Sequence, residues 1–242
     1  MIHVSLALPA WAAIATPGES IRVLSERSLA FPAPAASTPP VTPVAPAAST
    51  APTSPATPAT QAAAKPASPL LYVELTAVVI ADAGWQIAEA QQAITEALPI
   101  LVQCGVALQS LKLIEVAAPA AYRDLAPQTA RLLTSRLAPA RPAIFFVRTT
   151  RMRPAFEAEA FGAGNTRTRP ELINTVWVTR SAPDLPETLA HELFHVIANS
   201  GEHSDDEANL MHDSTAPGRR QLTPAQCVVL RENGRVNRLL RD

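Results

Sequence analysis

Two histidines and a glutamate lie close together as His191, Glu192 and His195, in the pentapeptide HELFH. On a helix, positions i and i+4 lie on the same face, so the two imidazoles point toward one spot. Two neutral imidazoles at this spacing are typical zinc ligands, and a glutamate between them suits a base that acts on a zinc-bound water. The pentapeptide therefore predicts a zinc hydrolase, and among hydrolases a peptidase.

A catalytic zinc site needs three protein ligands and one open position, so a third ligand must follow on a segment that folds back. The Asn-Ser-Gly run at residues 199–201 is suited to end the helix, because Asn and Gly tolerate the left-handed backbone that reverses a chain. His203 is then the favoured third ligand. Three acids that follow it compete for the same role: Asp205, Asp206 and Glu207.

The pattern of HExxH, a glycine-containing turn, a third histidine and a downstream methionine resembles the metzincin zinc peptidases. The resemblance covers about residues 70–240, and Met211 follows His203 by eight residues, as the Met-turn does in matrixin-like members. One spacing differs from the family. The third histidine usually lies six residues past the second, whereas His203 lies eight past His195, and Ala198 occupies the usual glycine position.

The resemblance implies three zinc ligands: His191, His195 and His203. Glu192 would accept a proton from the zinc-bound water and pass it to the leaving amine, and Met211 would form an apolar floor beneath the site. The strand at 173–179 would be the exposed edge along which an extended peptide aligns by main-chain hydrogen bonds. The loop at 213–221 would form the substrate pocket. The implied function is that of a zinc-dependent metalloendopeptidase.

Two other interpretations stay open. A catalytically silent, metal-stabilised domain could bind a partner while displayed on a flexible tether, and a fourth protein ligand such as Asp205 would favour that function. A thermolysin-like site would instead take its third ligand from a later helix, where Glu232 is the candidate. Three side chains near the site are expected to be solvated rather than functional: His212, Arg219 and Arg220.

The expected fold class is α+β, a metzincin-like zincin domain with a mixed twisted sheet, an HExxH helix, a Met-turn and a C-terminal helix. Hydrophobic patterns predict four strands and two helices before the HExxH helix. The strands are at 70–82, 106–116, 143–148 and 173–179, and the helices at 85–104 and 127–137. The segment from Arg151 to Pro170 is predicted to be a loop.

Both remaining helices carry start signals. Asp184 is the predicted N-cap of the HExxH helix, with Glu187 as its capping-box partner. The last helix is predicted to begin with Thr223 as N-cap, Pro224 in the first position and Gln226 as capping-box partner. These signals position the predicted zinc ligands between two defined helix starts.

The chain is predicted to have three parts. Residues 1–30 form an N-terminal segment, a weak candidate signal peptide or upstream fragment, in which 21–29 could form one strand or helix. Residues 31–69 are rich in Pro, Ala, Thr and Ser, with one charged residue, and are predicted to be a disordered linker. Residues 70–242 are the expected metallopeptidase-like domain.

The net charge and the distribution of apolar residues limit the classes of binding partner. The net charge of −1 offers no electrostatic basis for binding nucleic acid or an anionic membrane, and no stretch is long enough for a confident transmembrane helix. Cys104 and Cys227 could pair in an oxidising compartment or stay as buried thiols, and buried thiols are the favoured alternative. We expect a monomer, secreted or periplasmic, that acts on a peptide or protein substrate.

Overall fold

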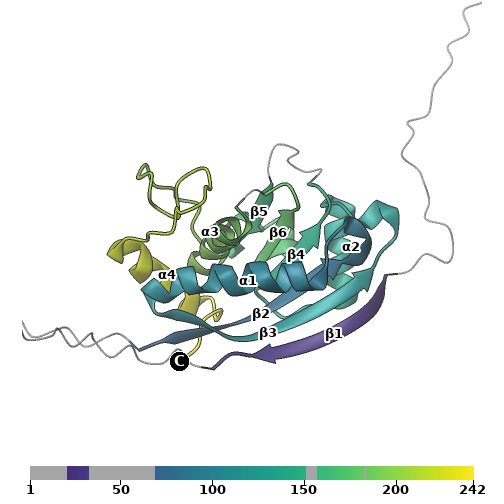
Figure 1. Ribbon diagram of the computed structural model, residues 1–242, viewed down its shortest axis with the longest axis horizontal. Helices are drawn as coiled ribbons and strands as arrows, with labels where there is room; N and C mark the ends of the chain where they lie inside the picture. The colour runs from purple at the N-terminus through teal and green to yellow at the C-terminus, as the bar shows by residue number, and fades with distance from the viewer. Residues whose placement is uncertain (1–20, 33–68, 151–156, 183) are drawn as a thin grey trace, which may run out of the picture.

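The computed structural model describes residues 21–32, 69–150, 157–182 and 184–242. A mixed sheet of six strands forms its centre, in the order β1-β3-β2-β4-β6-β5 (Figure 1). The strands are β1 (Arg22–Ala30), β2 (Leu71–Ile80), β3 (Val106–Ala117), β4 (Ala143–Val147), β5 (Ala158–Phe161) and β6 (Thr175–Thr179). The helices are α1 (Ile87–Leu101), α2 (Pro127–Leu137), α3 (Leu185–Ala198) and α4 (Pro224–Val236).

The four central strands run parallel to one another and form the core. Every residue of β4 and β6 is buried, as expected of parallel strands that are covered on both faces. Phe145 of β4 stacks on Trp177 of β6 with ring centroids 4.1 Å apart. Helices α1 and α3 contact each other and lie over the sheet side by side, which places α3 beside β5 and β6 (Figure 1).

Strand β1 belongs to the same sheet although it precedes the predicted linker. It pairs antiparallel with β3, and the pair is supported by an ion pair between Lys112 and Glu26 at 2.8 Å. Its residues are largely exposed, which explains why its sequence predicts a strand only weakly. A domain boundary at residue 70 therefore leaves out one strand of the sheet. The predicted linker and the candidate signal peptide fall almost entirely outside the described residues.

Strand β5 corrects two expectations. It lies within the segment 151–170 that was predicted to be a loop, and it pairs antiparallel with β6. Because β6 has β4 on its other side, β6 is an inner strand and β5 is the edge of the sheet. The expected edge at 173–179 is therefore wrong. Four residues rich in Ala and Glu carry little strand signal of their own, so the pairing with β6 defines this strand.

Cys104 and Cys227 form a disulfide, so the expectation of two buried thiols is wrong. Cys104 ends the short 3-10 helix η2 (Val102–Cys104), and Cys227 lies in the first turn of α4, which packs against η2. The predicted capping box of α4 is present, with Gln226 N donating to Thr223 Oγ1 at 3.2 Å. None of the helices in the described ranges is long and apolar enough to cross a membrane.

Candidate metal centre

Helix α3 begins where the sequence predicts, but without the predicted capping box. The Asp184 side chain makes no capping hydrogen bond to the helix backbone. Glu187 instead accepts from Arg220 Nε at 2.7 Å and from Gly218 N at 3.3 Å. The ion pair joins the Glu187 carboxylate to the loop after Met211 and so attaches this loop to the first turn of α3.

The apolar face of α3 determines where its histidines point. Leu189, Leu193, Val196 and Ile197 are fully buried, as the helical period predicts. The helix ends at Ala198, and Asn199 takes the left-handed conformation with φ of 47°. This reversal returns the chain so that His203 lies over the same end of the helix, as predicted from the Asn-Ser-Gly run.

The structure brings the three predicted histidines together. One ligand nitrogen of each of His191, His195 and His203 lies within 4.8 Å of the others. Exposure increases along the series, because His191 is buried, His195 is half-buried and His203 is exposed. The three rings therefore line a depression that is closed at His191 and open at His203.

Hydrogen bonds to backbone carbonyls define the protonation of the two helical histidines. His191 Nδ1 lies 2.8 Å from Leu210 O, and His195 Nδ1 lies 2.6 Å from Ser200 O. A carbonyl oxygen only accepts, so both Nδ1 atoms carry the proton and both Nε2 atoms present lone pairs. These Nε2 atoms lie 2.9 Å apart. Two acceptors so close repel each other unless a cation binds both, which fits a metal site with oriented ligands.

Burial keeps these groups neutral. Burial, together with the neighbouring His191, lowers the pKa of His195 to about 4. Burial also lowers the pKa of His191, against the opposing hydrogen bond to Leu210. Burial raises the pKa of Glu192 to about 8, with a further contribution from the Glu159 carboxylate. Neutral imidazoles are the form that binds a metal ion, so ligand protonation competes little near pH 7.

The lowered pKa of His195 predicts how acid acts on the metal-free protein. A group whose pKa is lower in the folded state stabilises the fold above its unfolded value, and this contribution is lost as the pH falls. Comparison of wild type with His195→Gln in EDTA should show the relative stability of wild type falling by roughly 3 kcal/mol between pH 7 and pH 4. Urea unfolding at each pH measures this difference, and a constant difference would contradict a buried, neutral His195.

A cleft of about 930 Å³ contains the histidine centre. Strand β5 and Glu157 before it line the cleft along 157–161, α3 contributes His191, Glu192 and His195, and the loop at 213–215 lines a further part. Asn199 joins two of these parts, because its Oδ1 accepts from Gly164 N at 2.8 Å. A Cβ at Gly162 would lie 2.8 Å from the same oxygen, so a side chain there would displace the Asn199 amide from this hydrogen bond. Asn199 thus holds the outgoing end of β5 against the end of α3, an arrangement that the sequence patterns did not predict.

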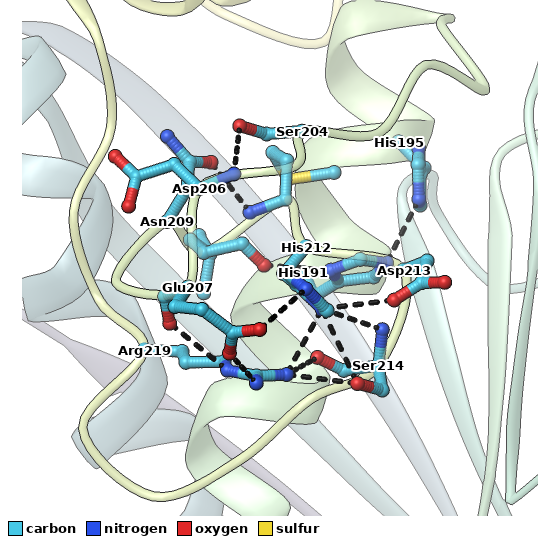
Figure 2. A network of polar contacts seen from close by, with 12 residues as sticks. His191, His195, Ser204, Asp206, Glu207, Asn209, His212, Asp213, Ser214 and Arg219 are labelled. Atoms are coloured by element: carbon cyan, nitrogen blue, oxygen red, sulfur yellow. Dashed lines mark hydrogen bonds and ion pairs between the residues drawn. The ribbon is translucent and has the colours of Figure 1, made fainter.

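Met211 is fully buried, and its carbonyl accepts from Ser204 N at 2.7 Å. The residues that follow it form a polar network around His212 (Figure 2). Arg219 Nη1 approaches His212 Nδ1 at 2.9 Å, and the Arg219 guanidinium also pairs with Glu207. The expectation that His212 and Arg219 are solvated is therefore wrong, because only 16% of the His212 side chain and 18% of the Arg219 side chain are exposed.

None of the acids proposed as alternative third ligands joins the histidine group. Within the described residues, the three histidines are the one group of three or more His, Cys, Asp or Glu side chains close enough to share a metal ion. Asp206 Oδ1 accepts from Ala208 N at 3.0 Å, and Glu207 pairs with Arg219. Glu232 is exposed on α4 and does not line the cleft. The geometry therefore favours His203 over each of these acids.

The six-stranded mixed sheet with its helices and the histidine centre together define a candidate metal-binding domain whose histidines lie in an open cleft. The same fold occurs in a metalloproteinase. Metalloproteinase-II from Bacteroides fragilis is similar to this chain with a TM-score of 0.50 and 21% sequence identity, over 67% of this chain and 52% of that chain. The match thus spans about half the length of the Bacteroides protein. No family model and no curated protein matches this sequence.

Proposed function

We propose that this protein is a zinc-dependent metalloendopeptidase. The observation that carries the proposal is the close approach of the Nε2 atoms of His191 and His195, 2.9 Å apart, with each Nδ1 on a backbone carbonyl and the His203 ring beside them. Neutral imidazole suits zinc, and three protein ligands with one open position are typical of catalytic rather than structural sites. The likeness in fold to a metalloproteinase supports the same class of reaction.

The position of each side chain indicates its role in the proposed reaction. His191, His195 and His203 would hold zinc, which when bound lowers the pKa of a coordinated water to about 7 and polarises the scissile carbonyl. Glu192 lines the cleft beside these histidines. In its ionised form, the Glu192 carboxylate would accept the proton of the attacking water and deliver it to the leaving nitrogen.

The position of β5 at the edge of the described sheet supports an endopeptidase rather than an enzyme for small molecules. All four residues of β5 line the cleft, and its other edge is paired with β6. An extended substrate would therefore add to β5 by main-chain hydrogen bonds and pass across the histidines. The buried Met211, attached through Ser204 to the segment after His203, is proposed as the apolar floor of a metzincin-like Met-turn.

The alternative, a silent metal-stabilised binding domain, would need the site to be closed by a fourth ligand. In the parts of the chain that the structure describes, the group contains three ligands, and an open cleft adjoins them. These observations favour the enzyme.

Zinc binding tests the proposal. Purified protein should contain about one zinc ion per chain, and adding zinc to the metal-free protein at 100 times Kd should stabilise it by about 2.7 kcal/mol. Metal analysis and thermal unfolding measure these effects, with Mg²⁺ as the control that should not raise Tm because imidazole suits it poorly. Protein that neither carries zinc nor gains stability from it would refute the proposal.

The disulfide supports an oxidising location. Disulfides persist in secreted and periplasmic proteins and are rare in the cytosol. We therefore propose that the protein acts outside the cytosol, which cell fractionation would test.

A further inference from the structure

The buried carboxylate of Asp184 has no cationic partner among the residues that the structure describes. Asp184 is 4% exposed, and its Oδ2 is buried without a hydrogen-bond partner. Its other oxygen meets Thr188 Oγ1 at 3.5 Å, the limit of a hydrogen bond. Burying a carboxylate is unfavourable unless a cation or several donors satisfy it, so the position indicates a cationic group that the described residues do not supply.

Asp184 lies in the cleft and not in the core. It lines the same cleft as the histidines, together with Thr188 and Thr215, whose hydroxyls are 3.1 Å apart. Its negative charge acts on the histidine centre, where it opposes the lowering of the pKa of His191. His191 follows Asp184 by seven residues, which corresponds to about 10 Å along a helix axis. A long side chain of a substrate bound at the histidines could therefore reach Asp184, whereas a short one could not.

Most of the other charged side chains that line the cleft are negative, like Asp184. Among the described residues that line the cleft, four acidic side chains face one arginine, Arg169: Glu157, Glu159, Asp184 and Asp213, apart from Glu192, which burial keeps neutral. The arginines of the loop after Met211 are engaged elsewhere, Arg220 with Glu187 and Arg219 with Glu207. They therefore do not make the cleft attractive to acidic side chains.

We infer that Asp184 is a specificity-determining residue that binds a lysine or arginine side chain of the substrate at a position adjacent to the scissile bond. The cleavage part of this inference rests on the proposed peptidase function, whereas the binding part does not. The competing explanation is structural: Asp184 precedes α3, where the helix dipole favours a negative charge. That explanation predicts a loss of stability on neutralising Asp184, with no change in substrate preference.

The substitution Asp184→Asn distinguishes the specificity role from the structural role, because it keeps the shape of the side chain and removes its charge. Zinc-loaded wild type and variant would be assayed on peptides that carry Lys, Met or Glu at each position flanking the cleaved bond. Wild type should prefer Lys over Met at one position by about 10- to 100-fold in kcat/KM, the range for a charge-assisted hydrogen bond. Asp184→Asn should remove this preference and leave hydrolysis of the Met peptide within about twofold. The exposed Asp82, changed to Asn, is a charge-matched control that should keep the preference.

A binding measurement distinguishes failure of this inference from failure of the proposed function. Fluorescence anisotropy with zinc-loaded Glu192→Gln, with and without Asp184→Asn, reports binding of the same peptides without cleavage. Lys-selective binding that depends on Asp184, in a protein that cleaves no peptide, would overturn the peptidase proposal and support Asp184. Cleavage without a preference for Lys, or an equal loss for all three peptides in Asp184→Asn, would overturn the role of Asp184 and leave the peptidase intact. Absence of both binding and cleavage would overturn both.

Discussion

Glu192→Gln is expected to lower kcat for peptide hydrolysis by about 10²- to 10⁴-fold, the usual contribution of a general base. The amide has nearly the same shape as the carboxylate but cannot accept the proton of the attacking water. The fold should persist. A carboxylate whose pKa is raised to about 8 destabilises the folded metal-free protein increasingly as the pH rises from about 4.5 to about 8, so its removal costs no stability near pH 7.

Steady-state kinetics together with zinc analysis measure this effect. Glu202→Gln is the matched control, because Glu202 is exposed, lies between the predicted ligands in sequence and does not line the cleft. Retained activity in Glu192→Gln would exclude Glu192 as the base. Loss of zinc in parallel with activity would indicate that the carboxylate supports the metal instead.

His203→Ala is expected to weaken zinc binding by more than about 100-fold, since even partners of the ligands contribute about 10- to 100-fold. Only two ligands would remain, both on α3. His203 is exposed, so its removal creates no cavity, and Tm of the metal-free protein should stay unchanged.

Competition titration with a chromophoric chelator measures this affinity. Asp205→Ala is the informative comparison, because Asp205 is exposed, lies two residues from His203 and is the acid favoured by the silent-domain alternative. A larger effect at Asp205 than at His203 would reverse the ligand assignment. Equal affinity for wild type and His203→Ala would show that this histidine does not bind the ion.

Elements with strong hydrophobic periodicity could be predicted closely. The predicted helix at 127–137 coincides with α2, and the strands at 106–116 and 143–148 correspond to β3 and β4 within one residue at each end. Their signals are local: buried runs bounded by Gly or Pro, or a helical stripe. The capping box of α4 could be predicted for the same reason, because all of its atoms come from four consecutive residues.

Elements stabilised by distant partners could not be predicted in the same way. Strand β5 is short and poor in residues that favour strands, and β6 supplies the pairing that defines it. The ion pair of Glu187 with Arg220 replaces a local capping box by a contact across 33 residues. The disulfide likewise depends on packing of α4 against η2, which no spacing in the sequence reveals.

The candidate site likewise combines features that local sequence predicts with features that depend on distant contacts. The i, i+4 spacing placed His191 and His195 correctly on one face of α3, and the helix stop at Asn199 correctly predicted that His203 returns toward them. The second role of Asn199, holding Gly164, has only a faint signal in the Gly-Ala-Gly run at 162–164. The buried charge of Asp184 has none, because an aspartate before a helix is most simply explained as a cap.

The disulfide between Cys104 and Cys227 has a consequence for a molecule whose chain is cut by a protease. The bridge encloses a sequence separation of 123 residues, which contains all three histidines and Glu192. A single cut anywhere inside this stretch leaves both pieces covalently joined and the halves of the cleft at high effective concentration. A nicked molecule would therefore migrate as one chain without reductant and as two fragments with it, and its loss of activity need not follow its loss of chain integrity.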